Sequence, residues 1–194
     1  MDLKTNIPVP AVVIRPYCLA DAADTLAIFL AAVTKTASAD YSPEQIQAWA
    51  RPEARELSTW HAAMARRNSY VATLDEEPAG FSDVDPHGYM DMMFVAPRYL
   101  RLGVARQLLN HVEDHARAKL LAELTANVSI TARPFFECHG FVVEAEQHPL
   151  MIGVQLTNYA MKKNLIDTGN QTSPSSRSHI QGFPQRKGGF ADVV

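Results

Sequence analysis

Short runs of apolar and β-branched residues, separated by polar turns, occupy the middle of the chain and predict β-strands. A first run, residues 11–15, lies between Pro10 and Pro16, which favours a terminal or edge strand. Three later runs are rich in β-forming side chains and span residues 69–74, 79–84 and 89–95. Because the turns between these three are short, we expect an antiparallel meander.

Three- and four-residue apolar spacing predicts helices on the N-terminal side of this meander. Asp21 can cap a first helix, whose core-facing stripe would be Leu26, Leu30 and Val33. Ser42 and Gln45 have the spacing of a capping box, which predicts the start of a second helix. A third helix is expected over residues 53–67, with one side formed by Leu57, Trp60 and Met64.

A longer amphipathic helix is expected over residues 104–121. Its apolar residues recur every four positions: Val104, Leu108, Val112, Ala116 and Leu120. A strand over 124–130 and a short helix over 131–138 follow, with Gly140 at the C-terminal cap. Residues 141–146 and 152–161 are predicted as the last strands. The pattern indicates an α/β (α+β) fold, in which helices flank a mixed, mostly antiparallel central sheet.

The same pattern divides the chain into a lead-in at 1–10, one domain at 11–165 and a disordered tail at 166–194. The tail contains four glycines, four serines and two prolines and has no periodicity.

Composition excludes several classes of function. The chain has 194 residues, 18 Lys and Arg against 21 Asp and Glu, and a net charge of −3, so no nucleic-acid partner is expected. The longest apolar runs are shorter than a membrane span, which argues against a membrane partner. Two cysteines and the absence of a recognisable export signal predict a cytoplasmic location.

One segment combines small residues with several arginines at a strand-to-helix junction. Gly103 and Ala105 allow a ligand to approach the backbone closely, and Arg98, Arg101 and Arg106 add positive charge. The first amides of a helix have no internal partners and lie at the positive end of its dipole. Such a junction favours pyrophosphate binding.

This segment, Val95-x-Pro97-x-Tyr99-Leu100-x-x-Gly103-x-Ala105, resembles motif A of the GNAT superfamily of N-acetyltransferases. A second segment, Ser129-x-x-Ala132-x-x-Phe135-Phe136-x-x-x-Gly140-Phe141, resembles another signature of the same superfamily. The resemblance covers residues 11–163 and implies a GNAT-like sheet whose two central strands, 89–95 and 124–130, splay apart around acetyl-CoA.

The resemblance also implies which residues hold acetyl-CoA as co-substrate, without a metal. The pantetheine arm would run along Met93, Phe94 and Val95 like an added strand, with a backbone N–H near Phe94 or Val95 polarising the thioester carbonyl. Ser129 would hydrogen-bond the arm. The pyrophosphate would rest on the loop and first helical turn, formed by Arg101, Leu102, Gly103, Val104, Ala105 and Arg106.

Two positions depart from the family pattern. Leu100 stands where Gln or Arg is common, which removes one polar contact to the cofactor. Phe136, placed beside the cofactor by the motif, stands where the family often has the tyrosine that protonates the departing thiolate. Tyr89, Tyr159 and His139 are candidate replacements. Since a thiol has a pKa of about 8.5, the thiolate can also leave unassisted.

An acceptor amine must lose a proton before it attacks, and Asp91 is the candidate base because it is the only charge in an apolar strand. Asp83 and Asp85 are alternatives that would instead bind a cationic substrate. Asp40 and Tyr41, between the first two helices, are candidate substrate contacts, or alternatively form a turn before Ser42.

The resemblance therefore predicts transfer of an acetyl group from acetyl-CoA to a primary amine of a small molecule, by direct attack in a ternary complex. Three alternatives stay open: a non-catalytic acyl-CoA-binding or regulatory module, a protein acetyltransferase that uses the tail, and an enzyme for longer acyl-CoA. A homodimer is a further possibility that the family suggests. His111 and His115 lack H-E-x-x-H spacing and are interpreted as a solvated helix face, and Cys138 as a packing residue rather than a nucleophile.

Overall fold

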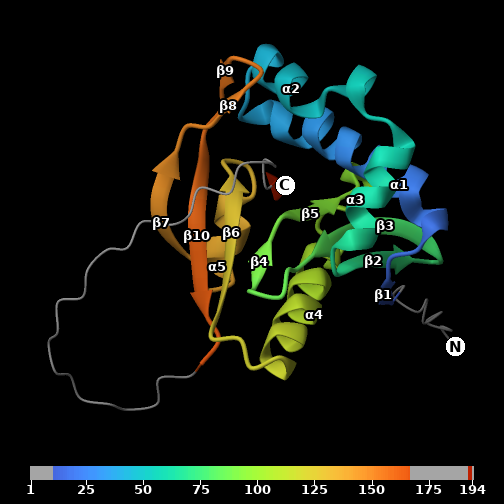
Figure 1. The fold of residues 1–194 in the computed structure, drawn as a ribbon, viewed down its shortest axis with the longest axis vertical. Helices are drawn as coiled ribbons and strands as arrows, with labels where there is room; N and C mark the ends of the chain where they lie inside the picture. Colours follow the sequence, from blue (N-terminus) through green and yellow to red (C-terminus); the bar gives the residue numbers. More distant parts are fainter. Residues whose placement is uncertain (1–10, 167–191, 194) are drawn as a thin grey trace, which may run out of the picture.

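A mixed β-sheet forms the centre of the described part of the protein (Figure 1). The computed structural model describes residues 11–166 and the backbone of residues 192–193. The order of the strands across the sheet is β1-β2-β3-β5-β11-β6-β10-β7, and β4 pairs with β6. These strands are β1 (Val12–Pro16), β2 (Ser69–Leu74), β3 (Glu77–Asp83), β4 (Tyr89–Met90), β5 (Met92–Val95), β6 (Glu123–Ser129), β7 (Val142–Gln147), β10 (Asn158–Asn164) and β11 (Asp192–Val193).

Most neighbouring strands run antiparallel, as the short polar turns predict. The expected meander is confirmed where β2, β3 and β5 pair in sequence. Parallel pairing occurs where β4 meets β6 and on both sides of β11. The parallel pairs all lie near β6, so the middle of the sheet differs from its two ends.

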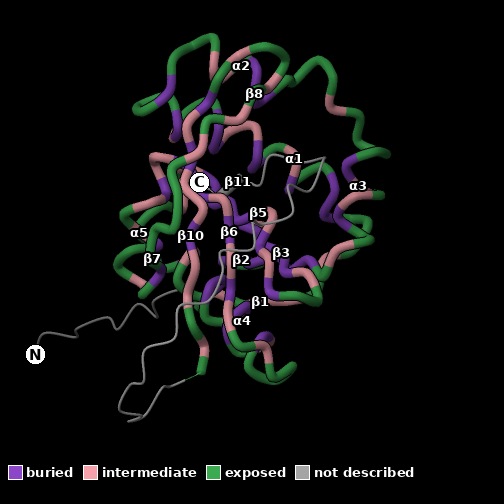
Figure 2. Tube along the Cα trace, turned by 60° about the vertical axis from the view of Figure 1, so that its left-hand side comes forward, coloured by how far each residue is buried: buried purple, intermediate pink, exposed green. Residues whose placement is uncertain are grey.

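Helices cover both faces of the sheet (Figure 1). One core cluster joins the sheet to α4 (Val104–Ala118) and α5 (Arg133–Cys138). A second cluster joins the opposite face to the N-terminal helices, which are α1 (Ala22–Ala31), α2 (Pro43–Ala50) and α3 (Leu57–Arg66). The buried segments of the tube in Figure 2 concentrate along the central strands and the inward sides of these helices.

The sequence pattern of α4 is confirmed over four of its five predicted positions. Val104, Leu108, Val112 and Ala116 are all buried, whereas Leu120 is 91% exposed. Leu120 has a φ of +57° and lies beyond the end of α4 at Ala118, so it leaves the helical stripe. The Ser42 capping box is also confirmed: Gln45 N–H donates to Ser42 Oγ at 3.2 Å, and Ser42 N–H donates to Gln45 Oε1 at 2.9 Å.

The predicted stripe of the first helix faces the core, but it is not the most buried part of the helix. Val33 is fully buried, Leu26 and Leu30 are half-buried and pack against the same cluster, and Ile28 and Phe29 are buried beside them. The helix continues from α1 into a π-helical turn, Ala32–Thr36, which the apolar spacing does not predict. Asp21 does not cap α1 with its side chain either; its carboxylate instead forms an ion pair with Arg15 at 2.6 Å.

Other boundaries also differ from the prediction. A 3₁₀ turn, Pro52–Ala54, precedes α3, and Leu57 is exposed although Trp60 and Met64 are buried. The expected strand over 152–161 begins only at Asn158. Its first part belongs to a hairpin of β8 (Leu150–Met151) and β9 (Val154–Gln155), because Ile152 and Gly153 both adopt positive φ in the two-residue turn.

The predicted lead-in at 1–10 lies outside the described residues, as do residues 167–191 and 194 of the predicted tail at 166–194. Residues 192–193 are an exception, since they form β11 inside the sheet.

Candidate active site

A break at Asp91 divides the expected strand over 89–95 into β4 and β5. Met90 and Met93 belong to the same core cluster, while Met92 belongs to the cluster on the other face. Strict alternation along a strand would place Met90 and Met92 on one face, so the backbone carries a bulge at this point. As a result β4 pairs with β6 and β5 pairs with β3, and β5 and β6 diverge.

Asp83, the last residue of β3, holds this break in place. Its Oδ1 accepts hydrogen bonds from the backbone N–H groups of Asp91 at 2.8 Å and Met92 at 2.9 Å. Asp83 is only 2% exposed, and burial raises its pKa to about 6. The structure therefore places Asp83 in the interior with backbone partners rather than on an open surface. Its expected contact with a substrate stays a prediction.

Arg67, which the sequence pattern did not single out, connects Asp83 and Asp91. Its guanidinium lies 3.3 Å from Asp83 Oδ2 and forms a second ion pair with Asp91 Oδ2. Asp91 is 17% exposed; burial raises the pKa of its carboxyl group, while the Arg67 cation acts in the opposite direction. The candidate base thus lies at the point where the strands diverge, partly exposed and paired with one cation.

A gap one strand wide separates β5 from β6 beyond the break, and β11 lies in it (Figure 1). Asp192 and Val193 pair with Met92 and Met93 of β5, and Val193 also pairs with Val128 of β6. The central strands therefore splay, as the resemblance implies. Met93 and Val95 face the core cluster of α4, whereas Phe94 faces that of α1.

The loop before α4 presents open backbone and positive charge. Gly103 has a φ of +84°, and a Cβ built on it would meet no described atom within 4 Å. The N–H groups of the first turn of α4, from Val104 onward, have no partner further along the helix. Arg101 and Arg106 are exposed and form no ion pair with the residues that the structure describes. Leu102 is exposed and Ala105 half-buried in the same region.

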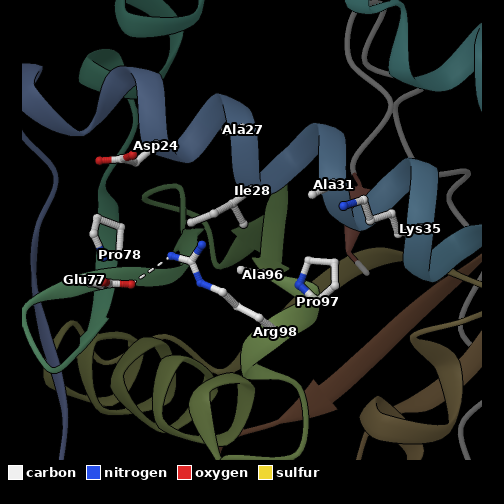
Figure 3. A pocket seen from close by; sticks show the side chains of 10 residues that line it. All are labelled: Asp24, Ala27, Ile28, Ala31, Lys35, Glu77, Pro78, Ala96, Pro97 and Arg98. Atoms are coloured by element: carbon white, nitrogen blue, oxygen red, sulfur yellow. Dashed lines mark hydrogen bonds and ion pairs between the residues drawn. The ribbon is translucent and has the colours of Figure 1, made fainter.

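Arg98 belongs to a different surface, so the expected cluster of three arginines is reduced to two. Its guanidinium lies 3.1 Å from Glu77 Oε2, and Tyr99 donates to the same oxygen at 2.6 Å. Figure 3 shows Arg98 pointing into a pocket between α1 and the ends of β3 and β5. The volume of this pocket is about 560 Å³, and its lining is Asp24, Ala27, Ile28, Ala31, Lys35, Glu77, Pro78, Ala96, Pro97 and Arg98.

The second GNAT-like signature lies on the other side of the gap. Ser129 ends β6, is buried, and its Oγ accepts a hydrogen bond from Ala132 N–H at 3.1 Å, which shapes the turn into α5. Phe136 is fully buried, with its ring packed edge-on against Phe135 and Phe141 at centroid distances of 5.4 and 4.9 Å. Phe136 therefore has a packing role, and its contact with a cofactor stays a prediction.

The candidate proton donors come from three places around β6: Tyr89 from β4, Tyr159 from β10 and His139 from the end of α5. Tyr89 is half-buried, and its hydroxyl accepts a hydrogen bond from Asn127 Nδ2 at 3.3 Å. Tyr159 pairs with Val128 and packs against the α4 and α5 core, with the Arg133 guanidinium 4.4 Å from its ring centroid. His139 lies at the end of α5, where its Nδ1 is 2.7 Å from the carbonyl oxygen of Phe135.

The predicted substrate residues Asp40 and Tyr41 connect the N-terminal helices to the end of β6. Tyr41 is buried; its hydroxyl donates to the Thr157 carbonyl at 2.6 Å and accepts from Ile130 N–H at 2.9 Å. Asp40 is exposed and accepts from Thr131 Oγ1 at 2.7 Å. Both residues therefore contact the segment that directly follows β6, but the hydroxyl of Tyr41 is occupied by backbone groups.

The prediction of a solvated histidine face on α4 is wrong. Nδ1 of His115 lies 3.1 Å from the Tyr70 hydroxyl, and its Nε2 lies 3.0 Å from Nδ2 of Asn68. The ring of His111 packs against the ring of Tyr70. Glu113, between them, is buried in ion pairs with Lys163 and Arg117. The amphipathic pattern missed this because β2 and β10 supply the partners from distant parts of the chain.

Comparison with known proteins identifies the family. A family model described as an acetyltransferase (GNAT) domain matches residues 37–163. An uncharacterized N-acetyltransferase, YafP, of Escherichia coli (strain K12) is 42% identical over 149 residues, which cover 77% of this chain and 93% of that protein. The chain therefore belongs to the GNAT family of acetyltransferases.

Solved structures agree with this assignment. A GCN5-related N-acetyltransferase from Rhodopseudomonas palustris is 34% identical with a TM-score of 0.75, and the match covers 80% of this chain and 95% of that one. The PaiA N-acetyltransferase of Thermoplasma acidophilum, solved with coenzyme A, has a TM-score of 0.65 at 18% identity over 79% of this chain and 99% of that one, which shows the shared fold. Within the described residues, no helix is both long and apolar enough to cross a membrane.

Proposed function

We propose that this enzyme transfers an acetyl group from acetyl-CoA to a primary amine of a small molecule, by direct attack in a ternary complex. The observation that carries the proposal is the gap between β5 and β6, which opens at Asp91 and leads to the loop before α4. Acetyl-CoA supplies an activated thioester when bound.

The gap fits the pantetheine arm because it already accepts one extended chain with amide groups, β11, against both of its edges. Met93, Phe94 and Val95 would bind the arm through their backbone on one side, and Ser129 stands at the end of the other. Arg101 and Arg106, together with the amides from Gly103 to Ala105, would bind the pyrophosphate, since exposed first-turn amides and positive charge favour that anion.

Asp91 would accept the proton of the incoming amine, directly or through water, because it is the partly exposed carboxylate at the opening of the gap. Burial raises the pKa of its carboxyl group above the ordinary value, which favours this role. Tyr89 or Tyr159 would protonate the departing thiolate; both flank β6, and Phe136 cannot donate a proton. Asp40 would contact the acceptor, because it is exposed and lies beside Thr131, just after β6.

A non-catalytic acyl-CoA-binding module is the second candidate, favoured by the buried phenyl ring of Phe136 in place of the family tyrosine. Turnover of acetyl-CoA with any amine would exclude it. A comparison of small amines with peptide N-termini and lysines as acceptors distinguishes the proposed small-molecule acetyltransferase from a protein acetyltransferase.

The decisive first experiment is thermal unfolding with and without acetyl-CoA. A ligand at a hundred times its dissociation constant stabilises the folded state by about 2.7 kcal/mol. The wild-type protein should show a clear shift, and Arg101→Glu should show a much smaller one. Arg66→Glu makes the same change of charge at an exposed position of α3, and this variant should retain the thermal shift with acetyl-CoA. A folded wild-type protein with no shift would overturn acetyl-CoA binding.

A further inference from the structure

The chain's own C-terminal strand lies where the proposed function places the pantetheine arm. Asp192 pairs with Met92, and Val193 pairs with Met93 on one side and Val128 on the other. All of these pairs are parallel. β11 is therefore a central strand of the described sheet and is held by backbone pairing along both edges.

The width of the gap explains why it accepts a peptide. Neighbouring strands lie about 4.8 Å apart, so two strands separated by a third lie about 10 Å apart. Met92, Met93 and Val128, which border the gap, are at most 7% exposed with the whole chain, including β11, in place. Buried N–H and C=O groups without partners are costly, and an extended chain such as β11 supplies partners to both edges of the gap.

We propose that the gap between β5 and β6 is a peptide-strand-binding slot whose occupant is this chain's own C-terminal segment, so that the segment must leave before acetyl-CoA binds. This inference rests on the proposed function for the identity of the competing ligand. It does not depend on the identity of the acceptor amine.

The connection along the chain makes this competition intramolecular. Twenty-five residues, 167–191, separate Ile166 from Asp192, and an extended chain of that length reaches up to about 80 Å. A tethered segment competes at a high effective concentration, so even weak pairing reduces the fraction of molecules with an open slot. The apparent dissociation constant for acetyl-CoA then rises by the inverse of that fraction.

A matched pair of substitutions in the full chain tests the proposal. Val193→Pro removes a backbone N–H and places a ring in a central strand, which β-pairing does not tolerate. Val193→Ala keeps the backbone N–H. By isothermal titration calorimetry, Val193→Pro should bind acetyl-CoA at least threefold more tightly than wild type, and Val193→Ala should stay within twofold of wild type. Thermal melting checks that both variants fold.

A peptide added in trans provides the second measurement. A synthetic peptide of residues 187–194 should weaken acetyl-CoA binding to the Val193→Pro protein competitively. The same peptide carrying Val193→Pro should have no effect. Binding of the fluorescently labelled peptides, followed by anisotropy, should show the same difference without any acetyl-CoA present.

The outcomes separate the two proposals. Equal acetyl-CoA affinity of wild type, Val193→Ala and Val193→Pro, with no effect of the peptide, overturns the self-occupied slot and leaves the proposed function intact. If none of the proteins binds acetyl-CoA, the proposed function fails. In that case anisotropy decides the slot: binding of the wild-type peptide alone supports it, and no difference between the peptides overturns it.

Discussion

Oδ1 of Asp83 accepts a hydrogen bond from the backbone N–H of Met92 at 2.9 Å. Asp83 ends β3 and Met92 begins β5, so a side chain of one strand fixes the point where the next strand turns away from β6. The splayed centre of the sheet therefore depends on a buried carboxylate as well as on backbone pairing. The same carboxylate contacts Arg67, which reaches Asp91.

The stability of the protein should depend on pH through Asp83. Its pKa is about 6 in the folded protein, above the ordinary value of 3.8, mainly because it is buried. The folded state therefore binds this proton more tightly than the unfolded state does. The stabilisation is present below about pH 4 and is lost as the pH rises through about 6, with a magnitude on the order of 2 to 3 kcal/mol.

Urea unfolding at several pH values between 4 and 7.5 measures this effect. Asp83→Asn keeps an oxygen that can accept hydrogen bonds from the N–H groups of Asp91 and Met92, but its side chain cannot titrate. As the pH rises, the wild-type protein should therefore lose free energy of unfolding relative to the variant. A difference that is independent of pH would show that the Asp83 carboxyl does not titrate in this range.

The strand pattern alone predicted most of the sheet but could not predict the break at Asp91. Residues 89–95 are apolar except at that position, which is also compatible with one continuous strand. The break depends on Asp83 and Arg67, and no local pattern specifies that either would face Asp91. The charge inside an apolar strand was the one local signal at this position, and it was interpreted as a candidate base within a continuous strand rather than as a break.

Local signals were reliable where the interaction is local. The Ser42 and Gln45 capping box and the buried face of α4 depend on neighbouring residues and are confirmed. The stripe of α1 also faces the core, but the apolar spacing did not predict the π-helical turn that follows it. Of the candidate site, the sequence placed the splayed strands and the loop before α4, but not Arg67 or β11.

Tyr41→Phe separates a structural role from a substrate contact. The change removes a hydroxyl that accepts from Ile130 N–H and donates to the Thr157 carbonyl, and it leaves both groups without that partner. We expect the free energy of unfolding to fall by about 1 to 3 kcal/mol in urea titrations. The KM for the amine should change less than twofold. A large rise in KM with unchanged stability would instead show that Tyr41 contacts the acceptor.

Phe136→Tyr would restore the residue that is common in the family, but in this chain it should destabilise the fold. The ring is fully buried against Phe135 and Phe141, so a new hydroxyl would be buried among apolar atoms at a cost of about 1 to 3 kcal/mol. Phe135→Tyr is the matched control, because Phe135 is half-buried and should tolerate the hydroxyl better. An increase in kcat at unchanged stability would contradict this prediction and show that position 136 reaches the thiolate.

Arg67 and Asp91 give a prediction about the pH dependence of catalysis. The Arg67 cation lowers the pKa of the Asp91 carboxyl group against the effect of burial. Arg67→Met removes the cation, so the pKa of Asp91 should rise and more of the base should be protonated at any given pH. The acid limb of the profile of kcat/KM against pH should therefore move upward by about one pH unit or more.

Two variants complete that experiment. Asp91→Asn should lower kcat by about 10²- to 10⁴-fold, since it removes the proton acceptor. Arg66→Met removes the same charge from the adjacent exposed residue and should leave the acid limb in place. If the limb does not move in Arg67→Met while the protein remains folded, Asp91 is not the group that titrates there. Asp85 and the acceptor amine itself would then be the groups to examine, because Asp85 lies close enough to Asp91 to influence the pKa of its carboxyl group.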